Sequence, residues 1–308
     1  MLGVLTGFAV VWIIIGVGYA VGRLQVLGPG AQQVLSRLAF FVASPALLLV
    51  TLSDADLHQV FSLPLLVAAG SAVSTAGLYL LATRWWLRRP LPELLVGGMS
   101  ASLVNAANLG LPIAVYVLGD AALIAPVLIF QLAAYTPTFL LLMDATGGAR
   151  GPSVRAVAAQ VGRNPIIIGT LIGLLLSATG TTLPAIVHEP ISLIGGAAVP
   201  AMLLAFGISL VGSRPLEKAA GRRADVLLAS AFKLLVQPAL AFLLARWVLG
   251  LDGHLLFTVV VCAALPTAQN MFVMASRYDR GVVIAKDTVL LTTIASLPVL
   301  AAVAALLA

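Results

Sequence analysis

The side chains best suited to holding a ligand gather around two prolines in apolar surroundings. The first group reads Asn105-Ala-Ala-Asn108-Leu-Gly110-Leu-Pro112. Pro112 cannot donate a hydrogen bond to the carbonyl of Asn108 and clashes with it, so a helix must kink or break here. Gly110 lets the backbone open at little steric cost, and Asn105 and Asn108 share a helix face. Neutral amides and freed backbone groups bind a ligand rather than react with it.

The second group reads Leu265-Pro266-Thr267-Ala268-Gln269-Asn270. Helix segments restarting at Pro112 and Pro266 would point positive dipole ends at the same region, which favours an anion such as a carboxylate. The alternative is a pair of packed proline kinks whose amides bond neighbouring helices. We predict a substrate site formed by Asn105, Asn108, Gly110, Pro112, Pro266, Gln269 and Asn270, with Gln131 as a further lining residue.

Three charged residues lie inside otherwise apolar stretches. Lys286 and Asp287 fall in the first turns of the stretch 283–307, and Lys233 falls inside 226–249. Ionisable groups in a membrane are functional candidates, so we predict a coupling or gating role for Lys233, Lys286 and Asp287. The alternative is that Lys286 snorkels to the interface and Asp287 pairs locally. Lys233 could neutralise Asp287 or approach a bound anion.

Residues for covalent or metal chemistry are sparse. The three histidines, His58, His188 and His254, are scattered, and the single cysteine, Cys262, excludes a disulfide within the chain and a site of several cysteines. There is no phosphate loop of Walker type, which argues against an ATP-driven pump. We therefore predict neither an enzyme nor a bound cofactor or metal. Coupling to H⁺ or Na⁺ stays open.

The composition predicts which elements position these residues. Of 308 residues, 61% are hydrophobic and 9% are charged, against roughly 25% charged in soluble domains. A helix needs about 20 apolar residues to cross a bilayer, and the chain offers such stretches repeatedly. The stretches without Asp, Glu, Lys or Arg are 1–22, 59–83, 94–119, 121–143, 164–187, 190–213, 255–276 and 288–308. An integral membrane protein follows.

Ten membrane-spanning helices are predicted once two interrupted stretches are accepted. One begins near Arg37, and the other contains Lys233 and Arg246. The N-terminal apolar run lacks the basic start of a signal peptide, so it is interpreted as the first span. The spans are 2–22, 33–52, 62–83, 94–118, 121–143, 163–180, 188–212, 226–249, 254–276 and 283–307.

Basic residues alternate between the loops that join these spans. Arginine and lysine fall in or beside the odd-numbered loops, while the even-numbered loops carry Asp, Glu and His; Arg246 is the exception. The positive-inside rule then places the odd loops in the cytoplasm and both termini outside, in a plasma or inner membrane. The net charge of +6 is explained by this distribution, so no nucleic-acid partner is expected beside the lipid bilayer.

The two halves of the chain resemble each other. Ala43-Ser-Pro45-Ala-Leu-Leu-Leu in the second span matches Ala198-Val-Pro200-Ala-Met-Leu-Leu in the seventh. Because five spans is an odd number, the second copy enters the membrane in the opposite orientation. We predict two inverted repeats, 1–143 and 163–308, joined by a cytoplasmic loop at 144–162. Inverted repeats with interrupted helices are typical of secondary transporters.

The Asn-x-x-Asn-x-Gly-Leu-Pro string, the run from Pro266 to Asp279 and the ten-span layout resemble the auxin efflux carrier family, which includes plant auxin carriers and bacterial malonate and malate permeases. The resemblance implies that spans 4 and 9 cross at their prolines beside the substrate. It also implies a scaffold domain of spans 1, 2, 6 and 7, a transport domain of spans 3–5 and 8–10, elevator-like movement, and a homodimer formed through the scaffold spans. The loop at 144–162 is much shorter than in the plant carriers, so phosphorylation control through it is not expected.

The predicted function is therefore secondary active or facilitative transport of a small organic anion: a carboxylate, an auxin-like acid or a dicarboxylate. One alternative is a sodium-coupled symporter of the bile-acid type with the same fold. A more distant alternative is an intramembrane enzyme or receptor, which would need a Ser/His, Asp/Asp or His/Glu constellation that the spans lack.

Overall fold

A computed structural model describes residues 2–54, 63–147, 154–212, 216 and 221–307. In this part of the chain the regular structure is helical, and β-pairing is limited to one isolated bridge. The chain divides into two compact units. Unit 1 comprises Met1–Ser62, Ala106–Ile129 and Ala159–Ser213, and unit 2 comprises Leu63–Asn105, Phe130–Ala158 and Arg214–Ala308.

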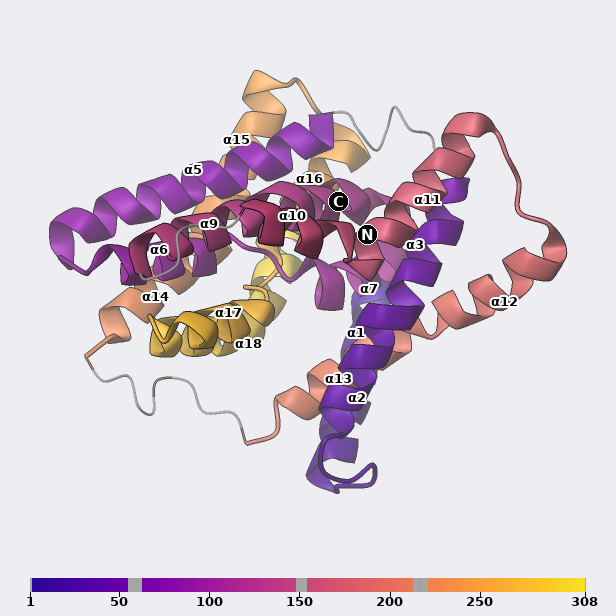
Figure 1. Cartoon of the computed structure of the whole chain (residues 1–308), viewed down its shortest axis with the longest axis horizontal. Helices are drawn as coiled ribbons and strands as arrows, with labels where there is room; N and C mark the ends of the chain where they lie inside the picture. The colour runs from indigo at the N-terminus through magenta and orange to yellow at the C-terminus, as the bar shows by residue number, and fades with distance from the viewer. Residues whose placement is uncertain (1, 55–62, 148–153, 213–215, 217–220, 308) are drawn as a thin grey trace. The chain divides into compact units, whose positions relative to one another are not determined.

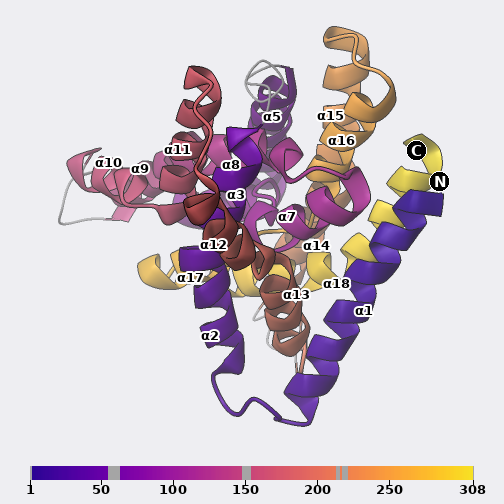
Figure 2. The same cartoon turned by 90° about the vertical axis from the view of Figure 1, so that its right-hand side faces the viewer.

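Unit 1 is built from helix pairs in close contact. α1 packs against α13, and α3 packs against α11 (Figures 1 and 2). Small residues permit this approach, since a methyl group on Gly18 of α1 would lie 2.5 Å from the carbonyl oxygen of Leu204 on α13. The elements of unit 1 are α1 (Leu2–Arg23), α2 (Ala31–Leu38), η1 (Ala39–Ala43), α3 (Ser44–Ser53), η2 (Ala106–Gly110), α7 (Leu111–Ile113), η3 (Ala114–Leu118), η4 (Ala121–Ile124), α11 (Pro165–Thr179), α12 (Ala185–Gly196) and α13 (Ala198–Ser209).

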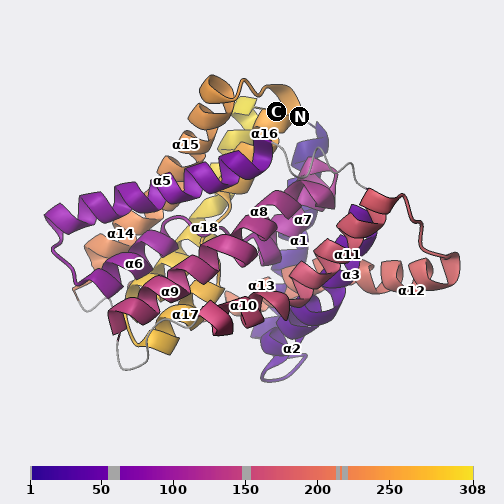
Figure 3. The same ribbon diagram turned by 45° about the horizontal axis from the view of Figure 1, so that its top comes forward.

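Unit 2 is organised around the short helix α6, which packs against α5, α9, α14 and α18 (Figure 3). Its core includes Met99, Leu103, Phe139 and Met271. The elements of unit 2 are α5 (Leu63–Trp86), α6 (Leu91–Ser100), η5 (Gln131–Tyr135), α9 (Thr136–Gly147), α14 (Arg223–Ala231), η6 (Phe232–Val236), α15 (Gln237–Leu243), η7 (Leu244–Val248), α16 (Gly253–Ala264), α17 (Asn270–Tyr278) and α18 (Val282–Leu307). Helices α8 (Ala125–Phe130) and α10 (Val154–Gly162) contain boundaries between the units.

Helices suited to a bilayer make up most of the described chain. By length and composition, six helical stretches can cross a membrane, and four shorter apolar helices of 10–17 residues accompany them. Large apolar side chains such as Ile13, Leu81 and Leu193 are exposed, as lipid-facing positions require. The prediction of an all-helical membrane protein is confirmed at this level, whereas the arrangement of ten spans as two inverted repeats stays a prediction. The six long stretches are Ala31–Ser53, Leu63–Trp86, Ala121–Thr146, Ala185–Ser209, Arg223–Val248 and Val282–Leu307.

Several helices accommodate proline through a wider turn. The π-helical segments η1, η2, η5 and η6 each end two residues before a proline, at Pro45, Pro112, Pro137 and Pro238 respectively. A proline lacks the N–H of an α-helical turn and clashes with the carbonyl four residues back. The wider turn relieves that clash without ending the helix. A proline in this chain therefore does not by itself mark an interruption.

Candidate functional site: a crossing of two interrupted segments

The first interruption lies in the predicted span 4, but upstream of its proline. Helix α6 ends at Ser100, and helical structure resumes at Ala106 and continues to Leu118. Pro112 sits within this resumed stretch, inside the short segment α7. The prediction that the helix breaks and restarts at Pro112 was therefore wrong, because the preceding π-turn absorbs the proline. The non-helical residues of this span are 101–105.

The second interruption lies where the sequence predicted it. Helix α16 ends at Ala264 and α17 begins at Asn270, with Pro266 in the non-helical segment between them. Leu265 has an extended backbone, with φ −56° and ψ 148°. The helical restart comes at Asn270 rather than at Pro266, so this part of the prediction was wrong by four residues. The amide side chains of Gln269, the N-cap residue, and Asn270, the first helical residue, therefore lie at the N-terminus of α17.

The two interruptions pair with each other inside unit 2. Val104 and Thr267 form an antiparallel β-bridge. The Asn105 amide donates to the Pro266 carbonyl at 2.8 Å, and the Ala268 amide donates to the Leu103 carbonyl at 3.0 Å. Backbone groups freed by a broken helix must find partners inside a membrane protein. We call the paired segments 101–105 and 265–269 the crossing.

Side chains from neighbouring helices satisfy the remaining backbone groups of the crossing. The Gln131 amide, oriented to match the backbone, donates to the Val104 carbonyl at 3.0 Å and accepts from the Val104 N–H at 3.1 Å. The Thr267 hydroxyl donates to the Ser100 carbonyl at 2.7 Å, and the Thr267 N–H donates to the Thr292 hydroxyl at 3.0 Å. The crossing is therefore fixed from α6, η5 and α18 at once.

Lys233 and Gln237, which lie one helical turn apart, form further hydrogen bonds at the crossing. The Lys233 ammonium nitrogen donates to Gln237 Oε1 at 2.6 Å and to the Ala263 carbonyl at 2.8 Å. Gln237 Nε2 in turn donates to the Ser102 carbonyl at 2.9 Å. This pair binds carbonyls beside both interruptions, since Ala263 lies in the last turn of α16 and Ser102 follows α6.

The predicted substrate residues divide by unit and by exposure. In unit 2, Asn105 and Gln131 are buried together with Pro266, whereas Gln269 is half-buried and Asn270 is exposed. Asn108, Gly110 and Pro112 belong to unit 1, where Asn108 is half-buried and the other two are buried. Within unit 2 the exposed amide among the predicted substrate residues is thus Asn270 at the start of α17, and Asn105 and Gln131 serve the crossing itself.

The three charged candidates are separate from one another in their contacts. The suggestion that Lys233 neutralises Asp287 was wrong, because Lys233 bonds Gln237 and Ala263 instead. The buried Asp287 accepts from the backbone N–H of Leu216 at 3.2 Å. Lys286 is exposed. Of these three residues, Lys233 is the one bonded next to the crossing, through Ala263 and Gln237.

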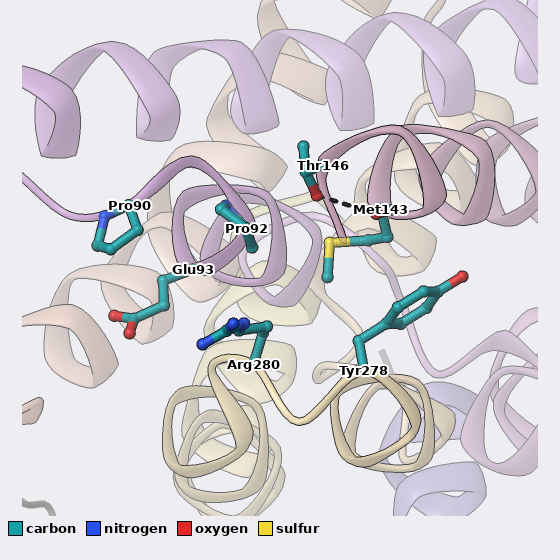
Figure 4. A pocket seen from close by; sticks show the side chains of 7 residues that line it. All are labelled: Pro90, Pro92, Glu93, Met143, Thr146, Tyr278 and Arg280. Atoms are coloured by element: carbon teal, nitrogen blue, oxygen red, sulfur yellow. Dashed lines mark hydrogen bonds between the residues drawn. The ribbon is translucent and has the colours of Figure 1, made fainter. Parts of the chain in front are cut away.

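A second polar region lies where α6 begins. Arg89 binds the buried Asp225 through two nitrogens, at 3.1 and 2.9 Å, and Arg222 pairs with Glu93 at 2.9 Å. The hydrogen bond to Asp225 raises the pKa of the Arg89 guanidinium above its usual value. Glu93 also borders a cavity of about 310 Å³ with Arg280 and Tyr278 (Figure 4). None of the predicted site residues lines this cavity.

Sequence reasoning missed several residues that hold the crossing. Thr267 stood inside the second string and Ser102 three residues before the first. A polar side chain next to each interruption is a signal that could have been used. Thr292 carried no such signal, since its role depends on how α18 packs. Gln237 precedes a proline in a membrane span, which marks it only as one of several polar candidates.

Comparison with known proteins gives the class. A family model described as "Membrane transport protein" matches residues 4–303. A Rhizobium meliloti protein named "Putative malonate transporter" is 28% identical over 290 residues, covering 92% of this chain and 89% of the relative. A Methanothermobacter thermautotrophicus protein named "Uncharacterized transporter" is 28% identical, with 93% of each chain covered. A rice protein named "Probable auxin efflux carrier component 5b" is 29% identical over 48% of this chain and 41% of its own length.

The helical fold and these matches define a multi-pass membrane transporter, not an enzyme. The chain belongs to the auxin efflux carrier family, which confirms the resemblance found in its sequence motifs.

Proposed function

We propose that this protein carries a small organic anion, a carboxylate or dicarboxylate, across the cell membrane by secondary active or facilitative transport. The observation that carries the proposal is the crossing, in which two interrupted helical segments pair through their backbones inside one unit. Interrupted helices of this kind form the binding sites of many secondary transporters. The name of the Rhizobium relative supports a dicarboxylate such as malonate.

The start of α17, directly after the crossing, is suited to an anion. Gln269 and Asn270 stand at the N-terminal end of this nine-residue helix, and Asn270 is exposed. A helix N-terminus carries partial positive charge, and amide N–H groups donate to carboxylate oxygens. The proposed ligand contacts in unit 2 are therefore Gln269 and Asn270, while Asn105, Gln131 and Pro266 hold the backbone that presents them.

We propose an elevator-like cycle in which the part of the chain bearing the crossing moves relative to a scaffold. The division into two compact units supports this proposal, because the crossing falls wholly within one of them. The proposal includes two inverted repeats, scaffold spans 1, 2, 6 and 7, transport spans 3–5 and 8–10, and a homodimer formed through the scaffold spans. The units differ from this division in one respect, because residues 106–129 of spans 4 and 5 fall in unit 1. Asn108, Gly110 and Pro112 are proposed to contribute to the substrate site in this cycle.

Purified protein reconstituted into liposomes tests the proposal. Uptake of radiolabelled malonate should saturate with concentration, and Asn270→Ala should lower the initial rate about 10-fold through loss of a hydrogen bond to a charged ligand. Gln33→Ala is the matched control, since it removes an exposed amide from α2. Uptake that does not saturate, or that is the same in Asn270→Ala and the unchanged protein, contradicts the site.

Ion replacement distinguishes the sodium-coupled alternative. Malonate uptake is measured with an inward sodium gradient, with choline in place of sodium, and with an imposed pH gradient. A rate that follows the sodium gradient favours a symporter of the bile-acid type, and a rate that follows the pH gradient favours proton coupling. A rate that depends on neither favours facilitated transport.

A further inference from the structure

The ammonium group of Lys233 is fully buried in unit 2. Its side chain is 0% exposed, and it lies in the π-helical segment η6 between α14 and α15 (Figure 1). Both of its hydrogen bonds go to uncharged oxygens, Gln237 Oε1 and the Ala263 carbonyl. Lys233 forms no ion pair with the described part of the chain. A buried cation normally has an anionic partner nearby, because desolvation is costly.

The acidic groups of unit 2 that could have served are engaged elsewhere. Asp225 binds Arg89, Glu93 binds Arg222, and Asp287 accepts from the N–H of Leu216. Asp144 accepts a hydrogen bond from the hydroxyl of Tyr278 at 2.7 Å. The charge of Lys233 is therefore left without compensation by these four carboxylates.

The oxygens around Lys233 are of the kind that bind an alkali-metal ion. Hard cations take backbone carbonyl and side-chain amide oxygens as ligands, and transporters that couple to sodium use carbonyls exposed by unwound helices. Here the carbonyl of Ala263 lies one residue before α16 ends, and Gln237 links to the carbonyl of Ser102 in the other interruption. A covalently attached cation thus binds a carbonyl beside the second interruption directly and is linked to the first interruption through Gln237.

We propose that Lys233 is the built-in cation of the crossing, taking the place of a coupling metal ion and supplying the positive charge that the bound anion balances. The statement about the bound anion rests on the proposed function, whereas the role of Lys233 as a cation does not. It assigns Lys233 as a positioning residue: it holds the two interruptions together and makes anion binding independent of sodium. It also explains why none of the four carboxylates pairs with Lys233, since the transported anion balances the charge of Lys233.

Thermal unfolding of the purified full-length protein in detergent tests the cation without requiring transport. The unchanged protein should melt at the same temperature in sodium chloride and in choline chloride. Lys233→Ala should melt several degrees lower in choline, and methylammonium or sodium should restore part of the loss by entering the vacated oxygens. Arg246→Ala is the matched control, because it removes an exposed positive charge from the same predicted span.

Lys233→Gln serves if the alanine variant does not fold, since it keeps hydrogen-bond donors and removes the charge. This variant should gain a stabilisation by sodium that the unchanged protein lacks. Initial malonate uptake should fall about 10-fold or more, as expected when a charged hydrogen-bond donor is replaced by a neutral one, and Lys233→Arg should recover part of it.

Two outcomes overturn the inference. In the first, sodium stabilises the unchanged protein relative to choline, which shows that a metal ion has its own site. In the second, Lys233→Gln has the same melting temperature as the unchanged protein in every salt. If the unchanged protein transports no carboxylate but Lys233→Gln becomes sodium-dependent in its melting temperature, then the proposed function fails while the built-in cation stands.

Discussion

Asp225 illustrates how single residues stabilise unit 2. Its side chain is 1% exposed, and it accepts two hydrogen bonds from Arg89, whose side chain is 22% exposed. Removing one member of a buried ion pair leaves the other charge uncompensated. Asp225→Asn should therefore lower the free energy of unfolding by about 2 kcal/mol, measured by thermal denaturation in detergent. Arg84→Ala, which removes an exposed arginine of α5, is the control and should change little.

The pH dependence of this pair follows from the arginine. Asp225 raises the pKa of Arg89, and a base whose pKa is raised on folding contributes stability that is complete below its unfolded pKa and is lost only as pH rises through the folded value. That window lies at strongly alkaline pH. The difference in melting temperature between the unchanged protein and Asp225→Asn should therefore stay constant from neutral to mildly alkaline pH. A difference that shrinks across this range would contradict the assignment.

Pairs of elements in unit 1 depend on glycine. A methyl group on Gly207 of α13 would overlap the carbonyl oxygen of Ile15 on α1, whereas a methyl group on Gly16 would meet nothing within 4 Å. Gly207→Ala should force the two helices apart and destabilise the protein by about 1–3 kcal/mol, as overpacking does. Gly16→Ala, at an exposed position of α1, is the matched control. Equal melting temperatures for the two variants would show that α1 and α13 do not pack as described.

The crossing depends on the polar side chain of Gln131. Gln131→Leu removes both bonds to the Val104 backbone and leaves two buried groups unsatisfied, which should cost about 2–4 kcal/mol. Thr138→Val is the control, because it alters an exposed residue of the following helix α9. Hydrogen exchange at Val104 should accelerate in the Gln131 variant but not in the control. Unchanged exchange would show that the amide does not hold the strand.

The helices and interruptions were predictable from sequence only where they depend on residues close together in the chain. Long apolar stretches and the polar residues after Pro266 led to the right helices and to the second interruption. Pro112 misled because a proline only forbids a regular α-turn, and the π-turn of η2 satisfies that restriction without a break. The real interruption at Ala101–Asn105 is stabilised by partners distant in sequence, namely Pro266, Gln131 and Gln237. No local pattern encodes those contacts.

At the scale of the whole molecule, the distribution of charged residues predicts how the chain is oriented in the membrane. The positive-inside rule predicts that Arg84 and Arg280, in or beside odd-numbered loops, face the cytoplasm and that Glu189 and Asp252, in or beside even-numbered loops, face outward. All four side chains are exposed, so substitution there should disturb packing little. The only native cysteine, Cys262, is buried in α16, which gives a low background for thiol labelling of the folded protein.

Single-cysteine labelling in intact cells tests this orientation. A membrane-impermeant maleimide should modify Glu189→Cys and Asp252→Cys directly, but Arg84→Cys and Arg280→Cys only after the cells are permeabilised. The unchanged protein measures the contribution of Cys262. Because the four positions lie in or beside predicted loops 3, 6, 8 and 9, the result also tests whether the number of spans between them is odd or even as predicted. Direct labelling at Arg84→Cys together with protection at Glu189→Cys would reverse the orientation, and a mixed pattern within one predicted side would contradict the ten-span layout.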